Sequence, residues 1–165
     1  MEAPLNRVEA AGLLTVDLEK LLPLPPLGQV DLAQFMEEGL LLREKPFRSA
    51  LKAHDWNQYA GQAVAIHVST EAIVPPWAYL LVGMYLAPHV VYYAVCPPEK
   101  LPEQYQLMKL AELDLTPFRD KKILLKGCAT VSPSVLTEFF RRVMPIAHLV
   151  FYGEACSSVP IYKKK

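Results

Sequence analysis

The sequence lacks the short motifs that identify the commonest nucleotide-binding and hydrolytic proteins. Its 7 glycines are spread thinly, and neither the dinucleotide pattern G-x-G-x-x-G nor the phosphate-loop pattern G-x-x-x-x-G-K-[ST] occurs. The zinc-protease motif H-E-x-x-H and the nucleophile motif G-x-S-x-G are also missing. These absences argue against a conventional nucleotide-binding loop, a zinc protease of the common type and an α/β-hydrolase.

Net charge and long apolar runs are absent too. The 165-residue chain carries 17 Lys and Arg against 17 Asp and Glu, so no overall field attracts nucleic acid or an anionic membrane. No apolar run reaches the ~18 residues of a membrane span, and the first residues lack the basic start and apolar stretch of a signal peptide. We therefore expect a cytoplasmic protein that binds neither nucleic acid nor membrane.

Cysteine is scarce, with three residues and no close pair. They stand at positions 96, 128 and 156, whereas a structural zinc site usually draws its ligands from close pairs such as C-x-x-C. An odd number of cysteines in a mid-sized cytosolic chain also argues against a disulfide framework. The cysteines are then free thiols, metal ligands or core residues, and the sequence by itself requires no cofactor.

From residue 62 onward the chain contains a regular alternation of two kinds of segment. Three longer stretches have helical spacing and helix-ending prolines. Between and around them lie short segments, rich in β-branched and aromatic residues, that predict strands buried on both faces: residues 63–69, 89–95, 122–127 and 147–152. This βαβαβαβ order predicts a three-layer α/β fold, in which helices cover a mostly parallel sheet.

The first 61 residues follow a different pattern and predict an N-terminal extension. Three prolines within residues 22–29 indicate an extended connector. A run of leucines at positions 40–42 needs to be covered by other parts of the protein. Because the whole chain has the size of one domain, we expect a single α/β domain. Residues 62–165 form its core in this prediction, and residues 1–61 pack on the sheet or on a partner subunit.

Polar residues gather where the predicted strands end. Ligands of open parallel sheets bind beyond the carboxyl ends of the strands, and Cys96, Cys128 and Cys156 each follow such an end. Of the 4 histidines, His67 alone lies near the same end of its strand. Together with Glu154, this predicts a ligand or thiol site made of Cys128, Cys156, Glu154 and His67.

The chemistry of this site has three interpretations. Cys128 and Cys156 are soft ligands suited to zinc or an iron–sulfur cluster. Cys128 is also a candidate nucleophile, since the helix that follows it can lower a thiol pKa. Packed and inert thiols are the third interpretation.

A second candidate site lies at the start of the helix that follows Cys128. Backbone N–H groups and hydroxyls at a helix N-terminus can hold a phosphate or a carboxylate. The candidate residues for this anion site are Thr130, Ser132, Ser134 and Ser157. The simpler interpretation is that Ser132 caps its helix.

Five segments of the chain together resemble a known family: LLLREKPFR, HDWNQY, AIVPPWAYLL, FRDKKILLKGC and YGEACSSVPIYKKK. The family is an uncharacterised bacterial one, domain of unknown function 2480, found chiefly in Bacteroidetes, and the likeness runs from Asn6 to the C-terminus. It implies no particular activity. Its association with iron–sulfur assembly genes favours a thiol or metal role, and since Cys96 belongs to none of the five segments, the pair of interest is Cys128 and Cys156.

The leading prediction is therefore a cytoplasmic accessory or binding protein that uses Cys128 and Cys156 as metal or sulfur ligands. Its candidate partners are iron–sulfur assembly proteins. One alternative is a non-catalytic homodimeric interaction module, in which the leucine run and the proline-rich connector form the contact. Another is an enzyme that acts on a small anion at the Ser132 helix start. The sequence does not decide whether the protein is an enzyme.

Overall fold

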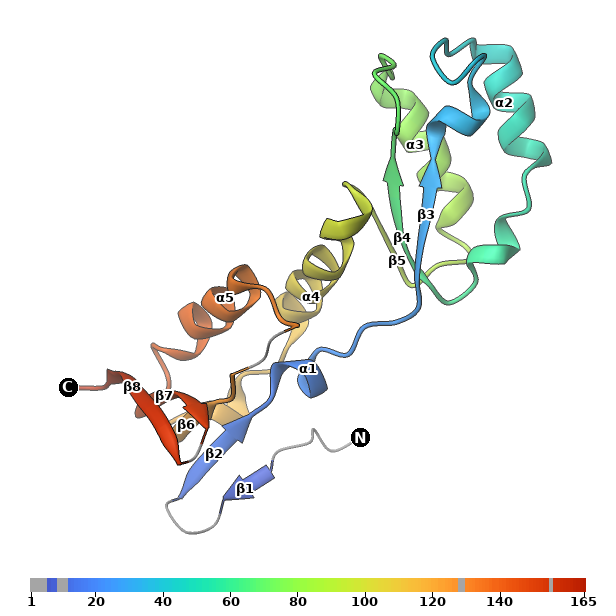
Figure 1. Ribbon diagram of the computed structural model, residues 1–165. Helices are drawn as coiled ribbons and strands as arrows, with labels where there is room; N and C mark the ends of the chain where they lie inside the picture. Colours follow the sequence, from blue (N-terminus) through green and yellow to red (C-terminus); the bar gives the residue numbers. More distant parts are fainter. Residues whose placement is uncertain (1–5, 9–11, 128–129, 155) are drawn as a thin grey trace. The chain divides into compact units, whose positions relative to one another are not determined.

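The computed structural model describes residues 6–8, 12–127, 130–154 and 156–165 (Figure 1). The chain divides into two compact units. Unit 1 comprises Met1–Pro23 and Gln106–Lys165, and unit 2 comprises Leu24–Tyr105. Each unit has its own sheet and its own apolar core, and each is considered by itself below.

Unit 1 is built on a five-stranded sheet with the order β1-β2-β6-β7-β8. Its three central strands are parallel, and the two outer strands run antiparallel to their neighbours. The strands are β1 (Asn6–Val8), β2 (Leu13–Val16), β6 (Lys122–Leu125), β7 (Leu149–Glu154) and β8 (Ser157–Lys163). The N-terminal strand β2 thus lies beside β6, far along the chain.

Three helices belong wholly or partly to unit 1: α1 (Leu18–Leu21), α4 (Leu101–Glu112) and α5 (Pro133–Val143). The chain passes between the two units twice, after Pro23 and within α4. Helix α5 begins as predicted, because Ser132 accepts a hydrogen bond from the N–H of Val135 and a proline fills the first helical position. This start places the apolar residues of α5 over the sheet.

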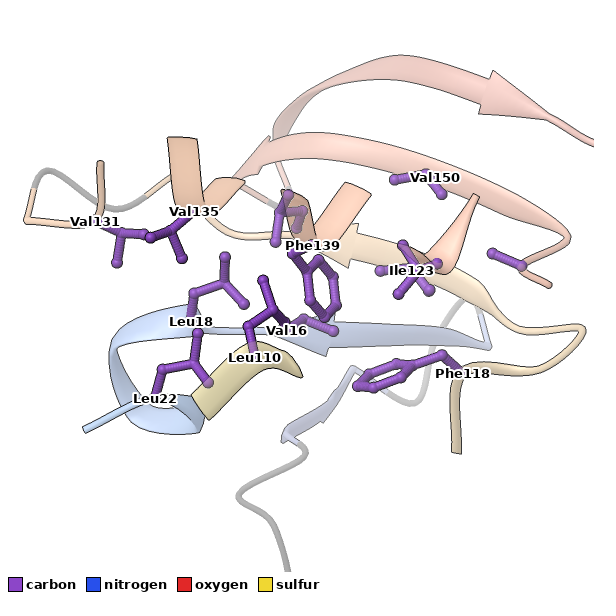
Figure 2. Close-up of a cluster of buried hydrophobic side chains, with 13 residues drawn as sticks. Val16, Leu18, Leu22, Leu110, Phe118, Ile123, Val131, Val135, Phe139 and Val150 are labelled. Carbon is purple, nitrogen blue, oxygen red and sulfur yellow. The ribbon is translucent and has the colours of Figure 1, made fainter. Parts of the chain in front are cut away.

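One apolar cluster joins these helices to the sheet of unit 1 (Figure 2). Val135, Phe139 and Val143 recur every four residues along α5, so they share one face of the helix. Phe139 packs edge to face against Phe118, with 5.4 Å between the ring centroids. Residues of β2 belong to the same cluster as those of β6 and β7, so the core of unit 1 combines both ends of the chain.

Unit 2 contains a fully parallel sheet with the order β3-β4-β5. Its strands and principal helices are β3 (Leu27–Asp31), α2 (Glu44–Ala53), β4 (Ala63–His67), α3 (Pro76–Leu86) and β5 (Tyr92–Val95). Both helices pack on one face of this sheet, where a single apolar cluster contains residues of α2 and α3.

The central strand β4 shows why its segment is apolar at every position. Val64 and Ile66 face the cluster formed with α2 and α3, whereas Ala63 and Ala65 face a second cluster that contains Leu101 of α4. Apolar clusters therefore lie on both faces of the sheet of unit 2, as expected for strands without polar alternation.

Short 3-10 turns complete the fold. They are η2 (Leu32–Phe35), η3 (Trp56–Tyr59), η4 (Pro98–Lys100) and η5 (Thr116–Phe118). Within the described ranges, no helix is long and apolar enough to cross a bilayer.

The structure confirms the α/β class, the parallel pairing and the order of strands and helices from β4 to β7. It corrects the expectation of one continuous sheet, because β4 and β5 belong to unit 2 and β6 and β7 to unit 1. The physical reason lies in the first 61 residues: they supply β2 as the parallel neighbour of β6 and β3 as the parallel neighbour of β4.

Strand β8 is an element that the sequence pattern did not predict. It contains Pro160, which cannot donate a backbone hydrogen bond and is depleted in strands. The structure accommodates Pro160 because β8 is an edge strand and because its pairing with β7 is irregular between Val150 and Phe151.

Candidate functional site

The residues predicted as metal or thiol ligands are divided between the two units. Cys156 and Glu154 are exposed where β7 turns into β8, in unit 1. His67 ends β4 and Cys96 follows β5, both in unit 2. Cys128 lies outside the described residues. The described residues of the predicted site therefore do not share a single sheet edge, which the prediction required.

The described part of the chain offers no ready metal centre. It contains no group of three or more His, Cys, Asp or Glu side chains arranged to hold a metal ion. Cys96 packs against Ala63, Ala65 and Leu101 and is 8% exposed. Burial, reinforced by the negative charge of Glu99, raises the pKa of the Cys96 thiol. Cys96 therefore fits the packed, inert interpretation.

At the C-terminal edge of the sheet in unit 2, Asp31 organises the loop that follows β4. Its carboxylate accepts hydrogen bonds from the N–H of Ala33 at 3.0 Å and from the N–H and hydroxyl of Ser69 at 3.1 and 2.5 Å. Burial raises the pKa of Asp31, but the hydrogen bonds from Ser69 and Ala33, with the nearby His67, lower it more, so its pKa is lowered overall. These contacts close the loop and give Asp31 a structural role.

His67 is paired in register with Asp31 on the neighbouring strand. Its Nε2 atom is buried and has no hydrogen-bond partner among the described residues. A second hydrogen bond ties this edge together, since the hydroxyl of Thr70 donates to the carbonyl of Gly39 at 2.6 Å. His67 thus lies at a sheet edge whose loops are connected to each other by side-chain hydrogen bonds. This edge belongs to unit 2, whereas Cys156 and Glu154 belong to unit 1.

Two residues of the predicted anion site, Thr130 and Ser132, form hydrogen bonds within the protein. The hydroxyl of Ser132 caps α5 through Val135, as the simpler interpretation expected. The hydroxyl of Thr130 donates to the carboxylate of Glu19, which brings a negative charge to this helix start. A bound anion would be repelled by that carboxylate. Ser134 and Ser157 are exposed, at the first turn of α5 and the first residue of β8.

A groove next to this helix start has the wrong chemistry for a small anion. It lies between α5 and the β7–β8 hairpin, and its walls are largely apolar, with side chains that include Leu136, Phe140, Tyr152 and Ile161. Anions bind where charged or polar donors converge. The geometry of unit 1 therefore gives little support to an enzyme that acts on a small anion at Ser132.

The most distinctive surface of the protein lies in unit 2, on α3 and β5. We call it the α3–β5 surface, and it consists of Leu80, Met84, Val91, Tyr93 and Val95, all exposed. Leu80 is 75% exposed and Val95 is 58% exposed, which is high for large apolar side chains. Exposed apolar patches of this kind on monomers mark interaction sites.

Helix geometry explains the exposed side of α3. Its buried stripe consists of Ala78, Val82 and Leu86, four residues apart, and packs into the core of unit 2. Leu80 and Met84 are offset by two residues and therefore point to the opposite side. A helix that is apolar all round is normally buried on all sides, so the outer stripe of α3 has the composition of a buried face.

Strand β5 continues the same surface. Val91, Tyr93 and Val95 alternate along the chain and share one face. The ring of Tyr93 lies directly on α3, because a Cβ atom added at Gly83 would come within 2.9 Å of it. The bare glycine thus allows β5 and α3 to form one continuous surface.

This surface carries no formal charge over a long stretch of chain. Between Glu71 and Glu99 the sequence contains no Asp, Glu, Lys or Arg. The homodimer contact predicted from the sequence lies elsewhere, at the leucine run and the proline-rich connector, where Leu40 and Leu41 are exposed. The signal that could have located the α3–β5 surface is this uncharged stretch around a helix with no polar face.

Comparison with known proteins places the chain in a family. Residues 2–164 match the family model described as "Protein of unknown function (DUF2480)", and the chain therefore belongs to this family. The resemblance predicted from the sequence is thus confirmed over almost the whole chain. No curated protein and no solved structure matches it.

Proposed function

We propose that this DUF2480 protein is a non-catalytic interaction module that binds a partner through the α3–β5 surface, and that the partner is a second copy of the chain. The observation that supports this proposal is an uncharged, exposed apolar surface that adjoins a strand edge with which no described strand pairs. Apolar area of this kind contributes to association in proportion to the area removed from water.

The free edge of β5 favours a second copy as the occupant. Strand β5 pairs with β4 on one side, and no described strand pairs with its other side. Unpaired N–H and C=O groups along such an edge are a template for another strand. Two copies of β5 can pair antiparallel about a two-fold axis, which is the commonest symmetry of soluble homo-oligomers.

Charge also favours self-association through this surface. A two-fold contact brings the same patch of both subunits together, so any net charge on the patch would repel its copy. Neither α3 nor β5 contains an Asp, Glu, Lys or Arg residue. The α3–β5 surface is therefore compatible with a copy of itself in backbone pairing and in charge.

Light scattering over a range of protein concentrations tests this proposal. We expect the wild-type chain to show a dimer mass. Leu80→Glu or Val95→Glu should move the midpoint of dissociation to a protein concentration at least ~10-fold higher, which corresponds to a loss of about 1.4 kcal/mol in the free energy of association. Ser49→Glu adds the same charge at an exposed position of α2 and should leave the dimer unchanged. A monomer mass at all concentrations, or a dimer insensitive to both surface variants, would overturn the proposal.

The position of Cys156 supports a second candidate function. Cys156 is exposed just beyond β7, and β7 lies parallel to β6, with Tyr152 in register with Leu125. Cys128 follows β6 in the sequence. In this second proposal the protein is an accessory protein that holds a metal ion or sulfur with Cys128 and Cys156, and iron–sulfur assembly proteins are its partners.

Metal content tests the second candidate directly. The protein is purified without oxygen or chelator and examined by elemental analysis and absorbance spectroscopy. We expect stoichiometric zinc or iron in the wild-type protein. The metal should be lost in Cys128→Ser and in Cys156→Ser and retained in the control Cys96→Ser. Wild-type protein without metal would refute this candidate and would leave the α3–β5 proposal untouched.

A further inference from the structure

The zero net charge of the chain results from two units of opposite charge. Unit 1 contains twelve Lys and Arg against nine Asp and Glu, whereas unit 2 contains five against eight. The expectation that the protein does not bind nucleic acid depended on overall neutrality. That argument does not apply to unit 1 alone, because electrostatic attraction depends on the local distribution of charge.

Six of the twelve cations of unit 1 gather at one edge of its sheet. We call this the basic edge, and it consists of Arg119, Lys121, Lys122, Lys163, Lys164 and Lys165, all exposed. It combines the start of β6 and the turn before it with the end of β8 and the residues after it. Two segments that are far apart in the sequence thus contribute to one cluster.

Backbone pairing places these segments side by side. Lys122 is in register with Leu149 of β7, and Leu149 is in register with Lys163 of β8. The N–H of His148 donates to the carbonyl of Lys121 at 2.9 Å, and the N–H of Lys164 donates to the carbonyl of His148 at 2.9 Å. Because neighbouring strands lie about 4.8 Å apart, the backbones of Lys122 and Lys163 are roughly 10 Å apart across the sheet.

Most of these cations have no counter-charge among the described residues. Lys164 pairs with Asp120 at 3.2 Å. Among the residues that the structure describes, the other five members of the basic edge form no ion pair. By contrast, Arg141 on α5 is neutralised by Glu138 at 2.6 Å. The basic edge is therefore a local excess of positive charge.

We propose that the basic edge binds the phosphate backbone of nucleic acid without reading its sequence. Nonspecific binding of this kind results almost entirely from Lys and Arg that displace counterions from phosphates. Five of the six cations are lysines, which act as point charges on flexible stems, whereas bidentate recognition of bases is more typical of arginine. This proposal concerns unit 1 and does not depend on the α3–β5 surface.

The composition of the basic edge favours nucleic acid over a membrane surface. Stable binding to a lipid headgroup layer combines basic residues with apolar side chains that enter the layer. Within residues 119–122, 148–149 and 163–165, the structure exposes no large apolar side chain. The edge therefore presents charge without an inserting group.

Fluorescence anisotropy with a labelled DNA duplex of arbitrary sequence tests the proposal. If the edge neutralises about five phosphates, the logarithm of affinity falls with the logarithm of salt concentration with a slope of about −4 to −5. We expect Lys122→Glu combined with Lys163→Glu to weaken binding at least ~10-fold at about 50 mM salt and to reduce the slope by about 2. Both side chains are exposed, so the fold is preserved, and circular dichroism checks this.

The matched control is Lys45→Glu combined with Lys52→Glu on α2, which changes net charge equally in unit 2. It should leave both affinity and slope unchanged. An equal effect of the two double variants, or no binding at about 50 mM salt, would overturn the proposal. Vesicles containing phosphatidylserine and a polyglutamate chain serve as rival ligands. If either binds as tightly as the duplex, the edge recognises negative charge in general and the proposal fails.

Discussion

Replacing Phe139 with alanine should destabilise unit 1 and leave unit 2 folded. The ring of Phe139 is fully buried at the centre of the apolar cluster of unit 1, where it packs on Phe118 (Figure 2). Unit 2 has a separate cluster, in which Phe47 is also fully buried. Two sheets and two cores predict that each unit responds mainly to changes in its own core.

The size of the effect follows from the cavity that the substitution creates. Truncation of a fully buried phenylalanine to alanine costs about 3–5 kcal/mol, because the transfer free energy of the ring is lost and the cavity collapses only in part. With a urea dependence of about 1.5 kcal/mol per molar for a unit of this size, the unfolding midpoint of unit 1 should fall by roughly 2–3 M. Ile123→Val, at about 0.5–1.5 kcal/mol, is the milder variant if Phe139→Ala does not fold.

The distribution of tryptophan makes the measurement selective. Both tryptophans of the chain, Trp56 and Trp77, lie in unit 2, so their fluorescence reports the unfolding of unit 2 alone, whereas far-ultraviolet circular dichroism reports both units. Phe139→Ala should shift the circular dichroism transition and leave the fluorescence midpoint in place. The control Phe47→Ala should shift the fluorescence midpoint.

A parallel shift of both signals in Phe139→Ala would refute this reasoning. It would mean that the two units unfold as one cooperative system, as the single domain predicted from the sequence requires. The experiment therefore also tests that prediction, since separate transitions would identify two domains, joined after Pro23 and within α4.

Three further predictions concern single side chains. Burial, opposed in part by Asp55, lowers the pKa of His54 below 6.5, so the unfolded chain binds a proton more readily. Stability in urea should therefore fall as pH drops below about 6.5, and His54→Gln should abolish this dependence; an unchanged pH profile in the variant would contradict it. In a count of thiols that react quickly with an aromatic disulfide, Cys156→Ser should remove one thiol and Cys96→Ser none, because Cys96 is buried; a fast thiol lost in Cys96→Ser would show that this core opens. Ser132→Ala should lower the unfolding free energy by about 1 kcal/mol through loss of the cap of α5. The loss should be the same with and without phosphate. A loss that appears only in the presence of phosphate would instead indicate that an anion binds at Ser132.

The local pattern of the sequence was sufficient to predict several elements. Residues 63–69, apolar at both parities, predicted a strand, and residues Ala63–His67 of this segment form β4, which is buried on both faces. Ser132 was predicted to cap the helix that it precedes, and its hydroxyl caps α5. Cys96 fits the interpretation of a packed and inert thiol. These features depend on a few consecutive residues, and local periodicity and capping chemistry describe such features well.

The candidate sites depended on longer-range pairing and were harder to predict. The ligand set that joined His67 to Cys156 assumed one sheet, but the two residues belong to different units. The contact between Thr130 and Glu19, which fills the predicted anion site, joins residues far apart in the sequence. Hydrophobic periodicity predicts that a strand exists, and it contains no information on which strand becomes its neighbour.

By itself, the sequence determined the α/β class, the order of strands and helices from β4 to β7 and membership of the family. The tertiary structure alone decided that β2 completes one sheet and β3 another, because both assignments require pairing between segments far apart in the sequence. It also decided which apolar residues remain exposed on α3 and β5 and that β6 and β8 bring their lysines to one edge. Burial and proximity are properties of the packed chain, whereas local propensity and composition are already present in the sequence.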